Sequence, residues 1–394
     1  MTDPFQTLRK KAIDVLHNAT TPKGILALPS NEVVENYTRI WSRDSIMAGL
    51  SGMNQNDPVL IEGLRNSLNT LKDFQTTHGI IPSNVSLGAP PNVSYGGTAG
   101  RVDATLWYII GALSYIAQTK DDAFRRAHIW HIEKAMQVTT IWEFNNKHLI
   151  YTPLSGNWAD EYPIHGYTLY DNCLRLWGLE LFAECTGRNE SVSQKIEHIR
   201  ESIKANFILS ENNTNKKYHS ILYERALEKG GKPYFIAGFN PSRYYTMFDC
   251  GGNGLALLLG LFERDQFENF EVYINGVFDE INCNLMPAFW PTINAKDDLF
   301  QDLSYNYAYE FKNNPHHFHN GGIWPIMNGW LAKGLARYDS FDLIHNMKSA
   351  YLDIAQKENY NFSEYISSDV IQPSGKSPLC YSAAGALMIL NPNN

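Results

Sequence analysis

The stretch Gly156-Asn157-Trp158-Ala159-Asp160-Glu161-Tyr162-Pro163 places two adjacent carboxylates after a tryptophan. It lies in a loop between two segments whose apolar residues recur at helical spacing, 121–144 and 168–185. Alone, an Asp-Glu pair in a loop is typical of solvated surface, because Asp and Glu are seldom buried. Its position before a helix becomes informative because other predicted helices also begin with charged residues.

Charged side chains stand at the start of two earlier predicted helices. Arg43 and Asp44 precede the small and apolar run 46–50, and Asp103 opens an apolar segment that continues to about residue 118. An aspartate at such a position can cap the helix, since it satisfies free backbone N–H groups and favours the helix dipole. This structural role and a functional role are compatible.

The whole chain is predicted to form about a dozen helices. The segment from about 208 to 245 is irregular and glycine-rich in part, which predicts a β-hairpin or excursion. No linker, no internal repeat and no βαβ alternation is visible. Helices paired as six hairpins can close into a ring whose loops converge on a funnel at one end. We therefore predict an all-α fold, an (α/α)6 toroid with minor β excursions, in which residues 1–394 form a single domain.

Composition favours a small neutral ligand. The 394 residues carry a net charge of −8 with scattered Lys and Arg, which argues against nucleic acid and membrane surfaces, because both need a basic face. The 9 Trp and 22 Tyr are typical of sugar clefts, although protein interfaces also enrich them. No signal peptide or membrane span is visible, and the five cysteines form no Cys-x-x-Cys pair, so we predict a cytoplasmic protein with reduced thiols.

Three histidines close together suggest two further interpretations. His316, His317 and His319 resemble a metal-binding cluster, but a helical His pair with a third carboxylate ligand is missing. We therefore predict neither a metal nor another cofactor. The same histidines support an alternative function, a non-hydrolytic sugar-binding protein or an epimerase in which histidines transfer the protons.

Hydrolysis of a glycosidic bond usually needs two carboxyl groups, one protonated and one ionised. When the ionised group activates water, the two lie roughly 6.5–9.5 Å apart and the product has inverted configuration. Five loop carboxylates stand next to aromatic or glycine-rich residues: Asp44, Asp103, Asp160, Glu161 and Glu364. The residues alone leave the choice among them open.

Four motifs follow one another along the chain between about residues 24 and 390. They are Asn36-Tyr37 through Trp41-Ser42-Arg43-Asp44, Gly100-Arg101-Val102-Asp103 with Leu106-Trp107, His319-Asn320-Gly321-Gly322-Ile323-Trp324-Pro325, and Glu364-Tyr365 with Gly375-Lys376. In this order they resemble the neutral/alkaline invertase family and the related amylo-α-1,6-glucosidase (glycogen debranching) domains. Both groups are (α/α)6 toroids, and trehalase and the processing α-glucosidases are more distantly similar.

The resemblance implies roles for individual residues. Asp160, in Trp158-Ala159-Asp160, corresponds to the general acid, and Glu364, which an aromatic residue follows, corresponds to the general base. Arg43, Asp44 and Asp103 would hydrogen-bond sugar hydroxyls, and Trp324 and Trp158 would stack on the sugar or wall the pocket. We also predict that Trp41, Glu161, His319, Asn320 and Lys376 contact the substrate.

The sequence after Asp160 departs from the invertase pattern. Invertases carry Asp-Arg-Arg-Met there, whereas this chain has Asp160-Glu161-Tyr162-Pro163. Glu161 is therefore a rival for the acid, and sucrose and an α-1,6-glucosidic bond are alternative substrates. We predict an inverting, exo-acting hydrolase of a small α-glucoside. A homodimer is the default expectation for its oligomeric state, which the sequence leaves open.

Overall fold

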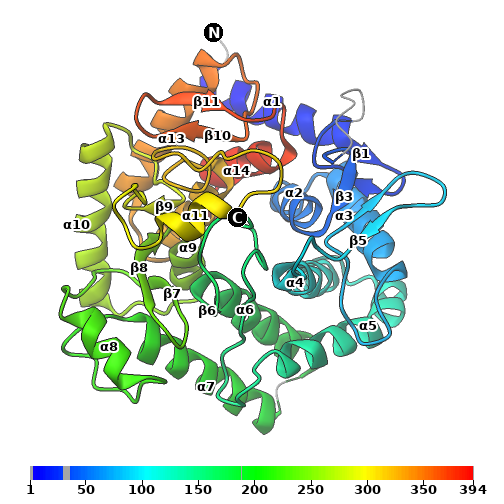
Figure 1. Ribbon diagram of the computed structural model, residues 1–394. Coiled ribbons are helices and arrows are strands. Elements are labelled where there is room, and N and C mark those ends of the chain that lie inside the picture. The colour runs from blue at the N-terminus through cyan, green and yellow to red at the C-terminus, as the bar shows by residue number, and fades with distance from the viewer. Residues whose placement is uncertain (1–2, 30–35, 188, 394) are drawn as a thin grey trace.

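The computed structural model describes residues 3–29, 36–187 and 189–393. Figure 1 looks along the axis of a ring of helices. Within the described residues, six helices form the inside of the ring: α2 (Ser42–Asn54), α4 (Val102–Thr119), α6 (Leu169–Thr186), α9 (Cys250–Leu258), α12 (Pro325–Arg337) and α14 (Cys380–Leu390). Each inner helix packs against the next, and α14 packs back against α2. This last contact closes the ring.

The composition of the inner helices explains their position. α14 reads CYSAAGALMIL and α9 reads CGGNGLALL, so neither contains a charged residue, and every residue of α14 is buried. A helix that is apolar on all sides is stable only when other elements surround it. Small residues also let the inner helices approach closely, since a Cβ on Gly385 of α14 would lie 2.4 Å from the backbone at Pro325 and Ile326 of α12.

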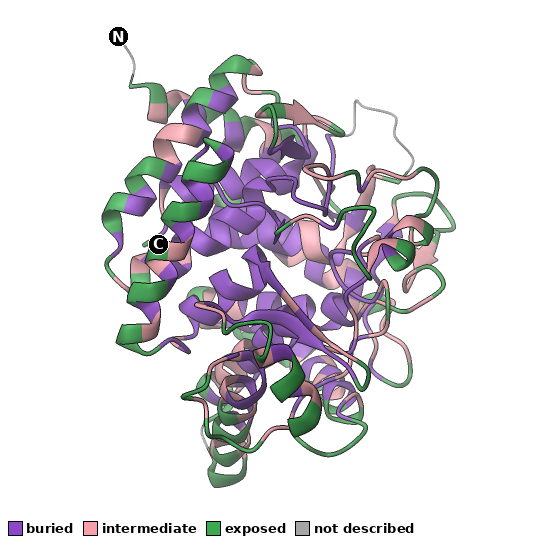
Figure 2. Ribbon diagram, turned by 60° about the vertical axis from the view of Figure 1, so that its left-hand side comes forward, coloured by how far each residue is buried: buried purple, intermediate pink, exposed green. Residues whose placement is uncertain are grey.

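The outer helices are amphipathic and alternate with the inner ones along the chain. Asp57, Asp121 and Asn189 cap three of them, because their side chains accept hydrogen bonds from backbone N–H groups of the first turn. Figure 2 shows that these helices are buried toward the ring and exposed on the outside. They are α1 (Pro4–Ala19), α3 (Pro58–Asp73), α5 (Asp122–Ile141), α7 (Glu190–Phe207), α10 (Arg264–Ile281) and α13 (Phe341–Lys357).

In the part of the chain that the structure describes, four small antiparallel sheets accompany the helices. Three of their strands lead directly into inner helices, β3 into α2, β6 into α6 and β8 into α9. The sheets pair β1 (Thr20–Thr21) with β2 (Gly24–Ile25); β3 (Arg39–Trp41) with β4 (Asn84–Ser86) and β5 (Val93–Ser94); β6 (Tyr167–Thr168) with β7 (Ile236–Phe239), β8 (Tyr244–Asp249) and β9 (Phe289–Trp290); and β10 (Tyr365–Ser367) with β11 (Gln372–Ser374). The strands therefore set where the inner helices begin.

The predicted all-α toroid with β excursions is confirmed. The hairpin expected between residues 208 and 245 is formed by β7 and β8, although β8 continues to Asp249. Two short helices in irregular segments, α8 (Ser220–Leu227) and α11 (Phe300–Tyr305), were not predicted because they are too short for a clear helical pattern. None of the helices in the described ranges has the length and hydrophobicity that crossing a lipid bilayer requires.

The close approach of α12 and α14 leads to a prediction about the stability of a variant at Gly385. We expect Gly385→Ala to lower the free energy of unfolding by about 1–3 kcal/mol, because the added methyl group must push two backbones apart. Gly276→Ala on outer helix α10 is the matched control, since a Cβ there meets nothing within 4 Å. Alanine should stabilise that position by about 0.5–1 kcal/mol. Urea unfolding of both variants measures the difference, and equal stability of the two would contradict the close approach.

Candidate active site

Segments before four of the inner helices, α2, α6, α12 and α14, and the first turns of α2 and α14 surround a cavity of about 620 Å³. Arg43 comes from the start of α2, Asp160 from the loop before α6, Trp324 from the residue before α12, and Glu364 from the residue before β10. These segments lie far apart in the sequence, and ring closure brings them together. The positive ends of the helix dipoles face this side, which favours negative and hydrogen-bond-accepting groups.

Most of the residues predicted from the sequence line this cavity: Trp41, Arg43, Asp44, Trp158, Asp160, Glu161, His319, Trp324, Glu364 and Lys376. Asp103 and Asn320 do not. Asp103 is buried and accepts a hydrogen bond from Arg43 Nη1 at 2.9 Å, so it supports Arg43. The Asn320 side chain binds backbone groups of Ile293 and Asn313. Asp103 and Asn320 therefore lie behind the wall of the cavity, with their side chains bonded to other protein groups.

Both carboxylate oxygens of Glu364 accept a hydrogen bond. The Tyr37 hydroxyl donates to Oε1 at 3.0 Å, and the backbone N–H of Lys376 donates to Oε2 at 3.2 Å. Burial, which leaves Glu364 only 6% exposed, raises the pKa of its carboxyl group, and these two hydrogen bonds oppose the increase. Gly375 permits this arrangement, because its φ is +82° and a Cβ there would lie 2.5 Å from Oε2.

Asp160 has a different environment, although it lines the same cavity. Arg101 Nη2 lies 2.5 Å from its Oδ2, and the same guanidinium also donates to the carbonyl of Ser155. The Asp160 side chain is 36% exposed. Arg101 therefore fixes the orientation of a carboxylate that still faces the open space of the cavity.

Two further carboxyl groups line the cavity. Burial raises the pKa of Glu161, and the neighbouring Asp160 charge raises it further, while Glu161 Oε1 accepts a hydrogen bond from Ala308 N–H at 3.2 Å. Burial also raises the pKa of Asp44, to about 6, even though Arg43 lies 3.8 Å away and favours the ionised form. The cavity thus contains carboxyl groups that are protonated more readily than in water.

Aromatic side chains form the remaining wall. Trp158 and Trp324 pack edge to face with ring centroids 5.6 Å apart, and the His319 ring stacks on Trp324 at 5.3 Å. His319 is buried, and burial lowers its pKa. Flat rings beside carboxylates are suited to a sugar, which has both apolar faces and hydroxyl groups.

The comparisons with known proteins agree with this geometry. The family model described as alkaline and neutral invertase matches residues 189–385, which is half of the chain. The chain belongs to this family. This invertase-family member is therefore a glycoside hydrolase. A search of curated protein sequences found no match.

Solved structures of other glycosidases share the toroid of this invertase-family chain. A GH63 mannosylglycerate hydrolase from Thermus thermophilus, in complex with Tris, is 13% identical, with 97% of this chain and 99% of that chain covered and a TM-score of 0.69. A wild-type glycosidase is 12% identical, with 99% and 96% covered and a TM-score of 0.62. A GH78 rhamnosidase of Bacillus sp. GL1 is 13% identical, with 97% and 34% covered and a TM-score of 0.59. At these identities the likeness concerns the fold.

The three clustered histidines of this family member lie in different environments. Only His319 lines the cavity. His316 Nδ1 is hydrogen-bonded to Ser368 Oγ at 3.0 Å, and His317 Nε2 lies 3.9 Å from Asp369. The described part of the chain contains no group of three His, Cys, Asp or Glu side chains that could hold a metal ion.

Sequence reasoning missed several residues around the cavity. Tyr37 and Arg101 contact the two carboxylates predicted as catalytic, and both lie inside motifs that had been recognised, where a partner for a buried carboxylate could have been sought. Tyr309 and Lys312 line the cavity from the irregular loop after α11. This loop has no periodicity, so no sequence signal identified it.

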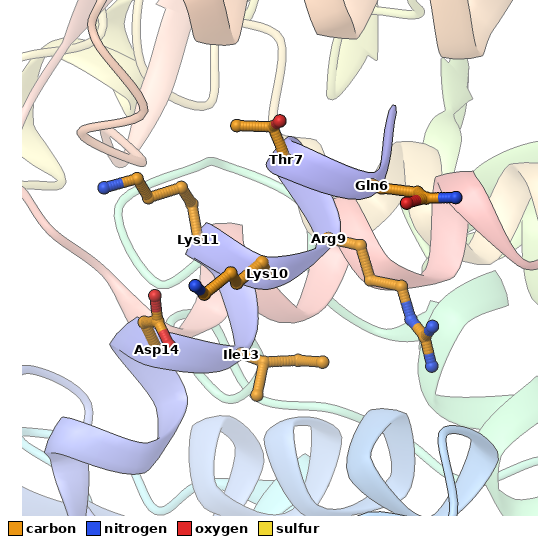
Figure 3. A pocket seen from close by; sticks show the side chains of 7 residues that line it. All are labelled: Gln6, Thr7, Arg9, Lys10, Lys11, Ile13 and Asp14. Atoms are coloured by element: carbon orange, nitrogen blue, oxygen red, sulfur yellow. The ribbon is translucent and has the colours of Figure 1, made fainter. Parts of the chain in front are cut away.

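Another hollow lies elsewhere on the surface and has no such features. Figure 3 shows its lining side chains, all of which come from α1 on the outside of the ring. Its volume is about 700 Å³, but it contains none of the predicted site residues and no aromatic side chain. The cavity at the start of the inner helices is therefore the candidate active site.

The raised pKa of Asp44 predicts that this residue reduces stability at neutral pH. The pKa of this carboxyl group is about 6 in the folded protein and about 3.9 in the unfolded chain. The free energy of unfolding therefore falls as the pH rises between these two values. At pH 7.5 we expect Asp44→Asn to raise the free energy of unfolding by about 1–2 kcal/mol, measured by urea unfolding. At pH 4.5 the difference should be much smaller. A difference that does not change with pH would contradict the prediction.

Proposed function

We propose that this glycoside hydrolase is an inverting, exo-acting enzyme for small α-glucosides, with Asp160 as general acid and Glu364 as general base. The observation that carries the proposal is that Asp160 and Glu364, from distant loops, line one cavity beside three tryptophans and a buried histidine. The volume of about 620 Å³ is within the range of small-molecule sites. A two-carboxylate mechanism needs this combination of groups.

Glu364 has the environment of a base. Its two oxygens accept hydrogen bonds from Tyr37 and from Lys376 N–H, which favours the ionised form, and burial opposes it. An ionised carboxylate with fixed oxygens can hold a water molecule and take its proton as the water attacks the sugar. The two hydrogen bonds thus limit the increase in pKa that burial causes at the proposed base.

Asp160 must carry a proton to act as the acid. Arg101 Nη2 lies 2.5 Å from Oδ2 of Asp160 and fixes the direction of this side chain. The side chain is still partly exposed to the cavity, so a sugar seated there would lie against it. In this proposal Asp160 donates its proton to the leaving oxygen, and Arg101 keeps the carboxyl group aimed at the bond to be broken.

The contacts of Glu161 and of the histidines give less support to Glu161 as the acid and to an epimerase. Glu161 uses one oxygen to accept the Ala308 N–H, so half of its carboxylate is directed to a loop. Proton transfer by several histidines, as in an epimerase, would need them at one site, yet His316 and His317 do not line the cavity.

The roles of the carboxylates can be separated with two substrates. We expect Asp160→Asn and Glu364→Gln each to lower kcat on a disaccharide at least ~100-fold, the usual scale of acid–base catalysis, with unchanged circular dichroism. On α-glucosyl fluoride, whose leaving group needs no proton, Asp160→Asn should regain most of its activity and Glu364→Gln should not. Glu161→Gln is the matched control, and rescue of that variant in place of Asp160→Asn would reassign the acid.

The hydrogen bond from Tyr37 to Glu364 leads to a prediction about how kcat/KM depends on pH. It lowers the pKa of Glu364, so Tyr37→Phe should raise that pKa. Because the base must be ionised, the acidic limb of the kcat/KM profile should move to higher pH, by about one unit. An unchanged acidic limb would argue against Glu364 as the base. Tyr305→Phe, outside the cavity, serves as the control.

The substrate is identified by a panel of sucrose, isomaltose, trehalose, maltose and limit dextrin. Mannosylglycerate belongs in the panel because a structurally similar protein is a mannosylglycerate hydrolase, which has also been solved in complex with glucose. NMR of the first product anomer tests inversion, since an α-glucoside should release β-glucose. Release of α-glucose would overturn the inverting mechanism, and hydrolysis of none of these compounds would overturn the proposed substrate class.

A further inference from the structure

We infer that Tyr309 is the platform on which the leaving group of the substrate stacks, and that Glu161 is the positioning residue that holds this platform in place. The inference rests on the proposed function and adds to it the class of leaving group, a carbohydrate ring. It starts from the loop between α11 and α12, which lies near the ring axis in Figure 1.

Tyr309 is an aromatic side chain on this loop that has no partner of its own. Its side chain is 82% exposed and yet lines the cavity. Within the described part of the chain its ring stacks on no other ring, and its hydroxyl makes no hydrogen bond. Exposing a large aromatic ring to water is unfavourable unless a ligand covers it, and at the edge of a sugar site such a ring can stack on a pyranose face.

The loop is attached to the segment that carries the proposed acid. Asn306 Nδ2 donates to the carbonyl of Asp160 at 3.4 Å and to that of Tyr162 at 3.3 Å. Asn306 Oδ1 also accepts a hydrogen bond from Ser155 Oγ at 3.0 Å. These contacts fix the start of the loop directly against the backbone of Asp160.

Glu161 attaches the middle and the end of the same loop. Its Oε1 accepts the N–H of Ala308, the residue before Tyr309, at 3.2 Å. Its backbone carbonyl accepts a hydrogen bond from Asn313 Nδ2 at 2.7 Å. Glu161 therefore sets where Tyr309 lies relative to the neighbouring Asp160.

This attachment decides which part of the substrate Tyr309 meets. A general acid donates its proton to the oxygen of the leaving group, so the leaving group lies beside the acid. A platform fixed to the acid's own segment faces that side of the scissile bond. Glu310 and Lys312, which also line the cavity, offer an acceptor and a donor for ring hydroxyls. An aromatic face with polar groups of both signs suits a neutral sugar ring.

Two substrates that differ only in the leaving group test the inference. We expect Tyr309→Ala to lower kcat/KM about tenfold on the best disaccharide of the panel, mainly through KM, and to change it less than twofold on α-glucosyl fluoride. Tyr309→Phe should behave like the wild type on both, because it keeps the ring. Tyr305→Ala is the matched control, since Tyr305 is 78% exposed on the same segment but does not line the cavity.

Glu161 is tested by the same pair of substrates. Glu161→Ala should reproduce the selective loss of Tyr309→Ala, and Glu161→Gln should restore KM, because an amide oxygen can still accept the Ala308 N–H. Equal losses on both substrates, or no loss on either, would overturn the inference while leaving the proposed function intact. If the wild type hydrolyses neither α-glucosyl fluoride nor any disaccharide, the proposed function itself fails.

Discussion

The need to enclose inner helices that carry no charged residue shapes the architecture of this protein. Helices such as α9 and α14 contain no charged residue, so each must be enclosed by its inner neighbours and by an outer helix. Closing the ring from α14 back to α2 satisfies this requirement for all of them. It also gathers the beginnings of α2, α6, α12 and α14 around one cavity, so that the packing of the core determines the place of the candidate active site.

The cavity combines the low polarity of this core with a concentration of acidic groups. Burial raises the pKa of Glu364, Glu161 and Asp44, and nearby donors oppose the increase to different extents. Glu364 receives two hydrogen bonds, whereas Asp160 faces a guanidinium and retains contact with water. Two carboxyl groups in one cavity thus acquire different environments, which is the physical requirement for an acid and a base to act on the same bond.

The loop after α11 belongs to neither the inner nor the outer ring of helices, and it connects the fold to the cavity. It is held by side chains and backbone groups of the segment 155–162, which also contributes Asp160 to the cavity. Glu161 therefore has a structural partner of its own beside the proposed acid. The adjacent carboxylates of the Asp-Glu pair differ in what they contact: one faces Arg101, the other a loop N–H.

The sequence by itself determined the ring of helices and half of the residues that line the cavity, because helical periodicity and motif order are properties of the chain. It could not separate Asp103 and Asn320, which lie behind the wall, from residues such as Trp324 that form it, since all occupy similar places before or at a helix start. Nor could it reveal that Tyr37 contacts Glu364 or that Tyr309 reaches the cavity. Those facts depend on contacts between segments far apart in the sequence, which only the closed tertiary structure brings within hydrogen-bonding distance.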